Sequence, residues 1–164
     1  MLSEAQVEQL LKGINPNRVA SRRGGGGKNL AYVEAWDIKA HMIRVFGYAE
    51  WSWDVIAADL AYAFGPDDTS KNHRVGYRVI GSLKIHQTGA TYTEAAVGMA
   101  NLPDPGEAHD MAIKTAESDA FKRAAINLGD NFGLSLYKNG QTAPVVIGLV
   151  GRDNVSHGET GESA

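Results

Sequence analysis

Three stretches with apolar residues at helical spacing predict three helices: Ser3–Lys12, Ala35–Phe46 and about Glu107–Leu128. The first begins with Ser3 and Gln6, a pair typical of a capping box, in which each side chain accepts from the backbone N–H of the other residue. A glycine follows each stretch directly, and glycine commonly ends helices. The pattern therefore predicts two short helices and one long helix.

The longest predicted helix carries a stripe of small apolar side chains that allows close packing onto a sheet. The stripe consists of Ile113, Ala116, Ala120, Ala124 and Leu128. Asp119 precedes Arg123 by one turn, the order that favours an ion pair on a helix surface. We expect that pair on the exposed side of the helix.

Alternating apolar and polar residues predict strands between the second and third helices. Trp51 and Trp53 alternate with polar neighbours, and Val75–His86 and Ala90–Met99 read as a hairpin joined by a short turn containing glycine. Aromatic residues with this period normally face a core, and direct contact with a ligand is the alternative. The predicted fold is α+β, with an antiparallel β-meander packed against the long C-terminal helix.

A basic, glycine-rich segment, Arg18–Tyr32, precedes the second helix and ends in a predicted strand over Asn29–Val33. Four consecutive glycines let main-chain amides approach a bound group closely, and flanking guanidinium groups suit phosphate oxygens. A flexible surface linker with solvated arginines is the alternative. The cations of this segment are Arg18, Arg22, Arg23 and Lys28.

The Gly-Lys pair in this segment does not form a nucleotide-binding P-loop. Arg22 stands where the motif needs its first glycine, and Asn29 stands where it needs Ser or Thr. The glycines also precede the predicted strand, whereas a P-loop follows one. These departures exclude ATP hydrolysis at this segment.

Composition narrows the function classes further. The chain has 164 residues, no cysteine and a net charge of −3, which suits one domain without disulfides and without thiolate metal sites. No apolar run is long enough to cross a bilayer, and residues 1–13 do not resemble a signal peptide, so we expect a cytosolic protein. Because the net charge is negative, a surface that binds a polyanion would have to be a groove of selected basic residues, repeated by assembly of several subunits.

Several separated motifs resemble the annealing domain of the Rad52 family of recombination proteins, in the same order and over about residues 3–140. They are Ser21-Arg22, Tyr32-Val33-Glu34, Phe46-Gly47-Tyr48 with Trp51, and Asp119-Ala-Phe-Lys-Arg-Ala followed by Gly129. We therefore expect an annealing domain over residues 1–140 and a C-terminal extension over 141–164 that is disordered after about 151.

The resemblance implies binding of single-stranded DNA and annealing of complementary strands in recombination and double-strand break repair. It implies a homo-oligomeric ring of about 10–11 subunits with a continuous outer groove. Arg22 would contact the DNA backbone, Tyr32 would form a wall, and Lys122 with Arg123 would form a basic pair; Arg23 and Lys28 are further candidates. The expected partners are single-stranded DNA, further copies of this chain and a host single-strand-binding protein, with no membrane.

Two residues depart from the family pattern. Ile126 stands where the family helix commonly carries Arg, and Gln87 stands where a Lys often lies beside the hairpin turn, which puts a secondary DNA site in doubt. The sequence has no counterpart of the eukaryotic C-terminal region that recruits a recombinase. We therefore expect a stand-alone annealer of bacterial or bacteriophage type, in the host cytoplasm.

Other function classes stay open. Annealing breaks no covalent bond, so we expect neither an enzyme nor a cofactor or metal. Asp104, Glu107 and Asp110 could instead form a nuclease metal site, although acidic residues also favour helix N-termini electrostatically. Lys122 and Arg123 could be ordinary surface residues paired with Asp119. A structural ring or scaffold without DNA affinity is the third possibility.

Overall fold

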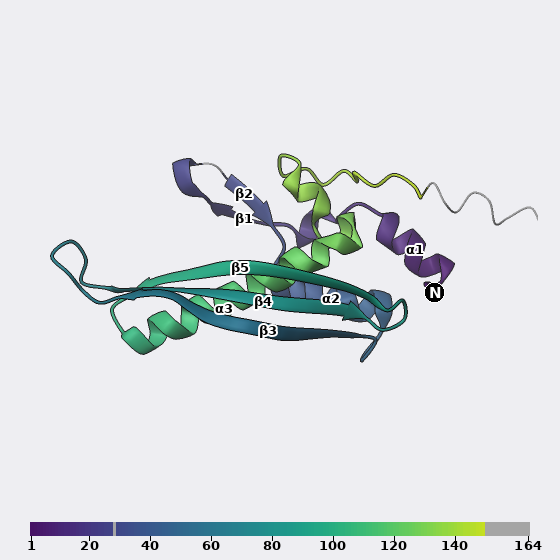
Figure 1. The fold of residues 1–164 in the computed structure, drawn as a ribbon. Helices are drawn as coiled ribbons and strands as arrows, with labels where there is room; N and C mark the ends of the chain where they lie inside the picture. The colour runs from purple at the N-terminus through teal and green to yellow at the C-terminus, as the bar shows by residue number, and fades with distance from the viewer. Residues whose placement is uncertain (28, 150–164) are drawn as a thin grey trace, which may run out of the picture.

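The protein is seen here in a computed structural model that describes residues 1–27 and 29–149. Figure 1 shows an α+β domain, as the sequence predicts. The helices are α1 (Glu4–Leu11), α2 (Ala35–Phe46) and α3 (Pro105–Ala125). The strands are β1 (Ala20–Arg23), β2 (Asn29–Tyr32), β3 (Trp51–Phe64), β4 (His73–Ile85) and β5 (Ala90–Leu102). Short 3-10 helices span Pro16–Arg18, Gly25–Gly27, Ile126–Leu128, Asp130–Phe132 and Leu134–Tyr137.

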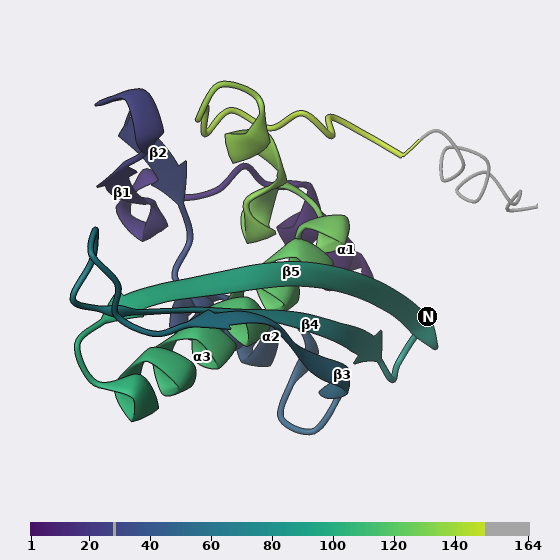
Figure 2. The ribbon, with the colours of Figure 1, turned by 60° about the vertical axis from the view of Figure 1, so that its left-hand side comes forward.

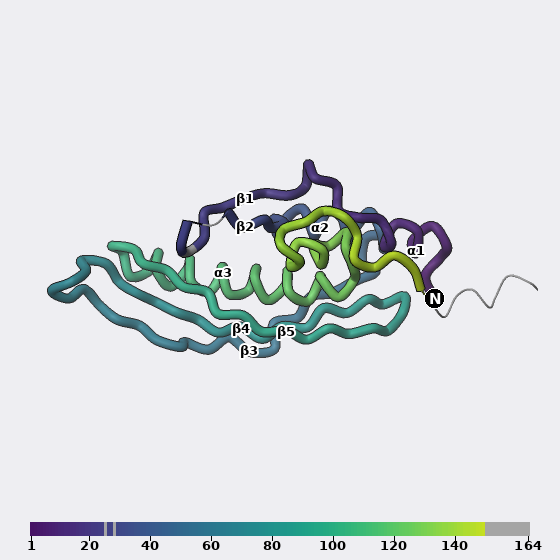
Figure 3. Tube along the Cα trace, turned by 90° about the horizontal axis from the view of Figure 1, so that it is seen from above, coloured from purple at the N-terminus to yellow at the C-terminus, as the bar shows by residue number. Residues whose placement is uncertain are grey.

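The three long strands form an antiparallel meander in the order β3-β4-β5, and α3 packs along one face of it. Figure 2 shows the curvature of the sheet around α3, and Figure 3 shows α3 lying between the sheet and the separate hairpin β1–β2. The predicted meander packed against a long helix is confirmed. The hairpin and the sheet therefore lie on opposite sides of α3.

Close contact between α3 and the sheet depends on small residues on both sides. The three alanines of the predicted stripe, Ala116, Ala120 and Ala124, are completely buried, and Ile113 and Leu128 at its ends are partly buried. Gly98 of β5 lies directly against the helix backbone, where an added Cβ would be 2.2 Å from the Ala112 carbonyl oxygen and the Ala116 nitrogen. The α-helix ends at Ala125, earlier than predicted, and the chain continues as the 3-10 helix Ile126–Leu128.

The two tryptophans of β3 face the core. The rings of Trp51 and Trp53 lie 6.1 Å and 5.3 Å from the ring of Phe121, which is completely buried on α3. The core interpretation of the alternating tryptophans is therefore confirmed. β3 continues beyond the predicted alternation to Phe64, and bulges after Val55 and Leu60 shift which of its residues face the helix.

The sequence did not predict β1. Its residues are polar and show no apolar alternation, yet they pair with β2 in antiparallel register, with Ser21 opposite Ala31 and Arg22 opposite Leu30. The glycine run forms the turn of this hairpin. Gly26 and Gly27 both have a backbone φ of 76°, which residues other than glycine rarely adopt. Its turn geometry, rather than its hydrophobic pattern, therefore explains the hairpin.

Arg18 lies in the interior rather than at the basic surface that the sequence suggested. Its guanidinium pairs with Asp37 of α2 at 2.7 Å, and its side chain is 12% exposed. It also donates to the backbone oxygen of Asn131 at 2.9 Å and to the side-chain oxygen of Asn131 at 3.0 Å. Asn131 in turn donates to the backbone oxygen of Gln9 on α1, at 2.7 Å. This network fixes the start of the hairpin to both short helices.

The segment after the last 3-10 helix returns to the core. The N–H groups of Val145 and Val146 both donate to a carboxylate oxygen of Asp130, each at 2.9 Å, and Asp130 is completely buried. The predicted domain boundary at residue 140 stays a prediction, and the predicted disorder after about residue 151 lies outside the described residues. No helix in the described ranges is long and apolar enough to cross a membrane.

Replacing Gly98 with Ala tests the contact between α3 and β5. The new methyl group would overlap backbone atoms that cannot move independently, so Gly98→Ala should lower the free energy of unfolding by about 3 kcal/mol. Gly65→Ala is the matched control, because nothing lies within 4 Å of its added Cβ. Urea unfolding would measure both, and equal stability of the two variants would contradict the packing described.

His41 predicts a pH dependence of stability. Burial, and then the charges of Arg18 and Arg44, lower its pKa to about 4 against an opposing effect of Asp37. In the unfolded chain His41 has its ordinary pKa near 6.5, so between pH 6.5 and 4 the unfolded state binds the proton more readily than the folded state does. The stability contributed by neutral His41 is therefore complete above pH 6.5 and is lost as the pH falls toward 4.

Between pH 7 and pH 5 we expect a loss of about 2 kcal/mol from His41 alone. His41→Gln keeps a neutral polar side chain and should lose correspondingly less over the same interval. Urea unfolding of both proteins at the two pH values would measure the difference. The same loss in both would show that His41 is not the titrating group.

Candidate nucleic-acid interface

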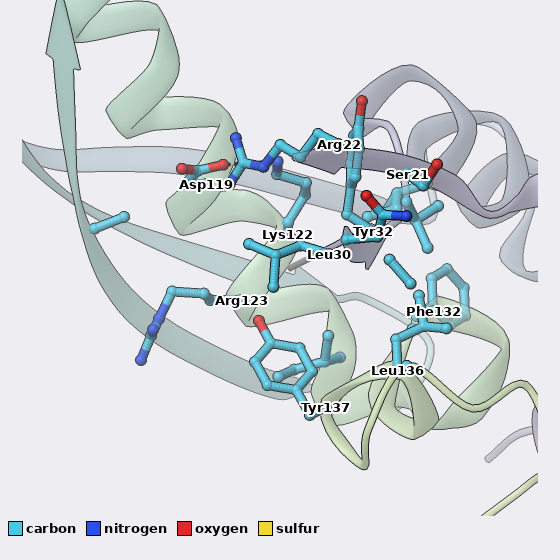
Figure 4. A pocket seen from close by; sticks show the side chains of 18 of the residues that line it. Ser21, Arg22, Leu30, Tyr32, Asp119, Lys122, Arg123, Phe132, Leu136 and Tyr137 are labelled. Carbon is cyan, nitrogen blue, oxygen red and sulfur yellow. Dashed lines mark ion pairs between the residues drawn. The ribbon is translucent and has the colours of Figure 1, made fainter. Parts of the chain in front are cut away.

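A groove separates the hairpin β1–β2 from α3 and the edge of β5. It consists of two adjoining cavities of about 940 Å³ and 610 Å³. Arg22, Tyr32, Asp119 and Lys122 line both of them, so the two cavities form one continuous groove. The hairpin supplies one wall and the last turns of α3 supply the other (Figure 4).

Two cations from distant parts of the chain converge on one tyrosine. The guanidinium carbon of Arg22 lies 5.6 Å from the centre of the Tyr32 ring, and the Lys122 nitrogen lies 5.7 Å from the same point. Both distances are within the range in which an aromatic ring attracts a cation. Arg22 lies opposite Leu30 in the hairpin register, so it shares a face with Tyr32 two residues further along β2. The hairpin register therefore directs Arg22 toward α3.

The hydroxyl of Tyr32 is held by Glu34, to which it donates a hydrogen bond of 2.9 Å. This hydrogen bond, some burial and the negative charge of Glu34 raise the pKa of Tyr32, against an opposing effect of the Arg22 charge. The phenol therefore stays protonated and neutral across the physiological pH range. The hydrogen bond thus holds the Tyr32 ring on the side of the hairpin that faces Lys122 of α3.

The groove cations on α3 have acidic partners. Lys122 pairs with Asp119 at 2.6 Å, and Arg123 lies 3.6 Å from Glu94 of β5. The predicted pair between Asp119 and Arg123 is therefore wrong. Residues three apart also share a helix face, and Arg123 instead extends toward the sheet edge. Among the described residues Arg22 forms no ion pair, so the hairpin contributes the least neutralised cation of the groove.

The structure brings four of the six predicted site residues together: Arg22, Tyr32, Lys122 and Arg123 all line the groove. Arg23 lines neither cavity. Lys28 lies outside the described residues. The hairpin therefore contributes one cation to the groove, Arg22 of β1.

Sequence reasoning missed other groove residues. Leu30, Tyr137 and Glu94 line the groove or pair with its cations. Tyr137 ends the stretch Phe132-Gly-Leu-Ser-Leu-Tyr, in which the sequence predicts no site residue. The signal that could have found it is a large aromatic residue followed by Lys-Asn-Gly, a polar turn sequence that tends to leave its neighbours at the surface.

The acidic cluster Asp104, Glu107 and Asp110 lies at the start of α3. The Asp104 side chain caps the helix by accepting from the Glu107 N–H at 2.8 Å, and Asp110 pairs with Lys114 at 2.7 Å. Within residues 1–27 and 29–149, no group of three or more His, Asp or Glu side chains could hold a metal ion. Asp104 and Asp110 therefore have structural roles that account for their positions.

The fold and the groove together define an α+β domain in which Arg22, Lys122 and Arg123 lie beside the aromatic side chains of Tyr32 and Tyr137, a combination of groups that suits a chain of phosphates. The family follows from comparison with known proteins. Residues 3–146 match the Rad52/22 family of double-strand break repair proteins, and the chain belongs to that family.

Curated relatives agree with this assignment. The chain is 28% identical over 131 residues to the DNA repair and recombination protein rad22 of Schizosaccharomyces pombe, covering 78% of this chain and 27% of that protein. It is 28% identical over 138 residues to the DNA repair and recombination protein RAD52 of Saccharomyces cerevisiae, covering 82% and 28%. This chain thus spans about a quarter to a third of the relatives it matches. These relatives are fungal, and the bacterial or phage source stays a prediction.

Replacing Glu34 tests the fixed position of Tyr32. Glu34→Gln removes the negative charge that accepts from the phenol, so the pKa of Tyr32 should fall toward its ordinary value near 10. Carbon NMR of tyrosines labelled at the ring would follow this titration. Glu107→Gln is the control, because Glu107 lines the smaller cavity but makes no hydrogen bond to Tyr32. An unchanged pKa in Glu34→Gln would refute the contact.

Proposed function

We propose that this domain binds single-stranded DNA in the groove between β1–β2 and α3 and anneals complementary strands in recombination and double-strand break repair. The observation that carries the proposal is the convergence of Arg22 and Lys122 on Tyr32. Two cations fixed by one aromatic ring provide a preorganised track for successive phosphates. Membership of the Rad52/22 family supports the same assignment.

Binding of this kind needs no catalytic chemistry. Cations in the groove would displace the counterions condensed on each strand, which lowers the repulsion between two polyanions. A fixed backbone path would keep the strand free of its own secondary structure and leave base edges available for pairing. The domain would therefore act by binding rather than as an enzyme, and it would require no cofactor.

Assembly explains how an acidic chain could hold DNA. Each subunit has a net charge of −3, and Asp119 and Glu94 partly neutralise the α3 cations. A single groove would therefore bind weakly. In a homo-oligomeric ring the grooves would join, and each further contact would add to the binding of the same strand. We propose such a ring as the active form.

The test is strand annealing with two complementary labelled oligonucleotides. Arg22→Ala and Lys122→Ala should each weaken binding of single-stranded DNA about tenfold and make its affinity less dependent on salt, by about one in the slope of log affinity against log salt. Annealing should slow in parallel. Lys71→Ala is the matched control, because Lys71 is exposed in the loop between β3 and β4, outside the groove.

Light scattering on all three variants would show whether each still assembles as the native protein does. Full annealing by Arg22→Ala and Lys122→Ala, with assembly intact, would place the DNA elsewhere. No annealing by the native protein would leave the alternative of a scaffold without DNA affinity.

A further inference from the structure

The larger cavity of the groove has two chemically different halves. Arg22, Lys122 and Asp119 lie at one end, and Tyr137 lines the other end together with the buried side chains of the core below it. Figure 4 shows Tyr137 and Leu136 well apart from Asp119 and Arg22, with Leu30 between the two groups. Electrostatics can account for the first half but not for the second.

The apolar half is open. Leu30 is 46% exposed, Val97 is 53% exposed and Tyr137 is 67% exposed. Scattered apolar residues at a surface are ordinary, but these three line one cavity of about 940 Å³. That volume is in the range of cavities that enclose small organic groups. The cavity therefore has room for more than a phosphate.

The two halves together match the two parts of a nucleotide. A phosphate gains nothing from apolar walls, and a purely apolar ligand would leave Arg22, which forms no ion pair among the described residues, without an anion. A nucleotide combines an anionic phosphate with a flat aromatic base, and both halves belong to one continuous cavity. The cations at one end would bind the phosphate of a nucleotide, so the apolar end would receive the base of that nucleotide.

We propose that the apolar half is a nucleobase pocket, in which Tyr137 stacks on one base of the strand whose phosphate lies at Arg22 and Lys122. The exposed ring of Tyr137 supplies a π-face that accepts any base, so the pocket reads no sequence. Arg123 also lines this cavity and has a guanidinium group that can stack on a base. This pocket rests on the proposed function of the groove.

Such a pocket would select single strands. The bases of a duplex are already stacked on one another, so a base within a duplex cannot also stack on Tyr137. A duplex therefore cannot use the apolar half, whereas a single strand can. The base must leave Tyr137 when it stacks on its neighbours in the product duplex, so annealing itself would loosen the product.

The test compares two labelled strands that carry the same phosphates. One is oligothymidylate, and the other is a matched strand of abasic deoxyribose phosphates. Native protein should bind oligothymidylate at least about fivefold more tightly, which is the lower limit for stacking of one base on an aromatic side chain. Tyr137→Ala should bind both strands almost equally, and Tyr137→Phe should restore the preference because it keeps the ring.

Tyr48→Ala is the control, because Tyr48 is also highly exposed but does not line the groove. It should bind both strands as the native protein does. Equal binding of both strands by native protein would overturn the nucleobase pocket while leaving the phosphate track intact. Failure to bind either strand would overturn the proposed function of the groove as well.

Light scattering, which measures the assembly mass, tests whether the apolar half instead contacts a second copy of this chain. An altered assembly mass in Tyr137→Ala, with the preference for bases retained, would assign the apolar half to contact with a second copy of this chain and would overturn the proposal. An unchanged mass with the preference lost is the result that the nucleobase pocket predicts.

Discussion

The buried ion pair between Arg18 and Asp37 determines where the hairpin β1–β2 lies. Both side chains are about nine-tenths buried, and two hydrogen bonds from Arg18 to Asn131 satisfy more of its donors. Burying two charges is expensive, and removing one partner would leave an unpaired charge at a cost of about 3–5 kcal/mol. The hairpin therefore has one position relative to α3, and the width of the groove follows from it.

The distribution of charge in the groove reconciles an acidic chain with a polyanionic ligand. Lys122 and Arg123 are partly neutralised by Asp119 and Glu94, so the groove does not present a dense positive patch. Its cations instead have fixed positions, because Arg22 and Lys122 lie at similar distances from the Tyr32 ring. Positions fixed in advance reduce the entropy lost on binding.

Local patterns predicted most of the fold but only part of the groove. The helix Ala35–Phe46 and the meander follow from periodicity and glycine positions, which are properties of neighbouring residues. β1 was missed because its polar residues are paired by the geometry of a glycine turn. The partner of Asp119 and the role of Tyr137 depend on contacts between distant elements, which periodicity does not encode.

The central claim is that single-stranded DNA lies between β1–β2 and α3. The chain has no cysteine, so a single introduced thiol is a unique reporter. Leu30→Cys places that thiol in the groove, on the face of the hairpin that carries Arg22, and Thr91→Cys places it on an exposed position of β5 that does not line the groove. Oligothymidylate should slow the reaction of the first thiol with a maleimide and leave the second unchanged. Equal protection of both, or of neither, would contradict the claim.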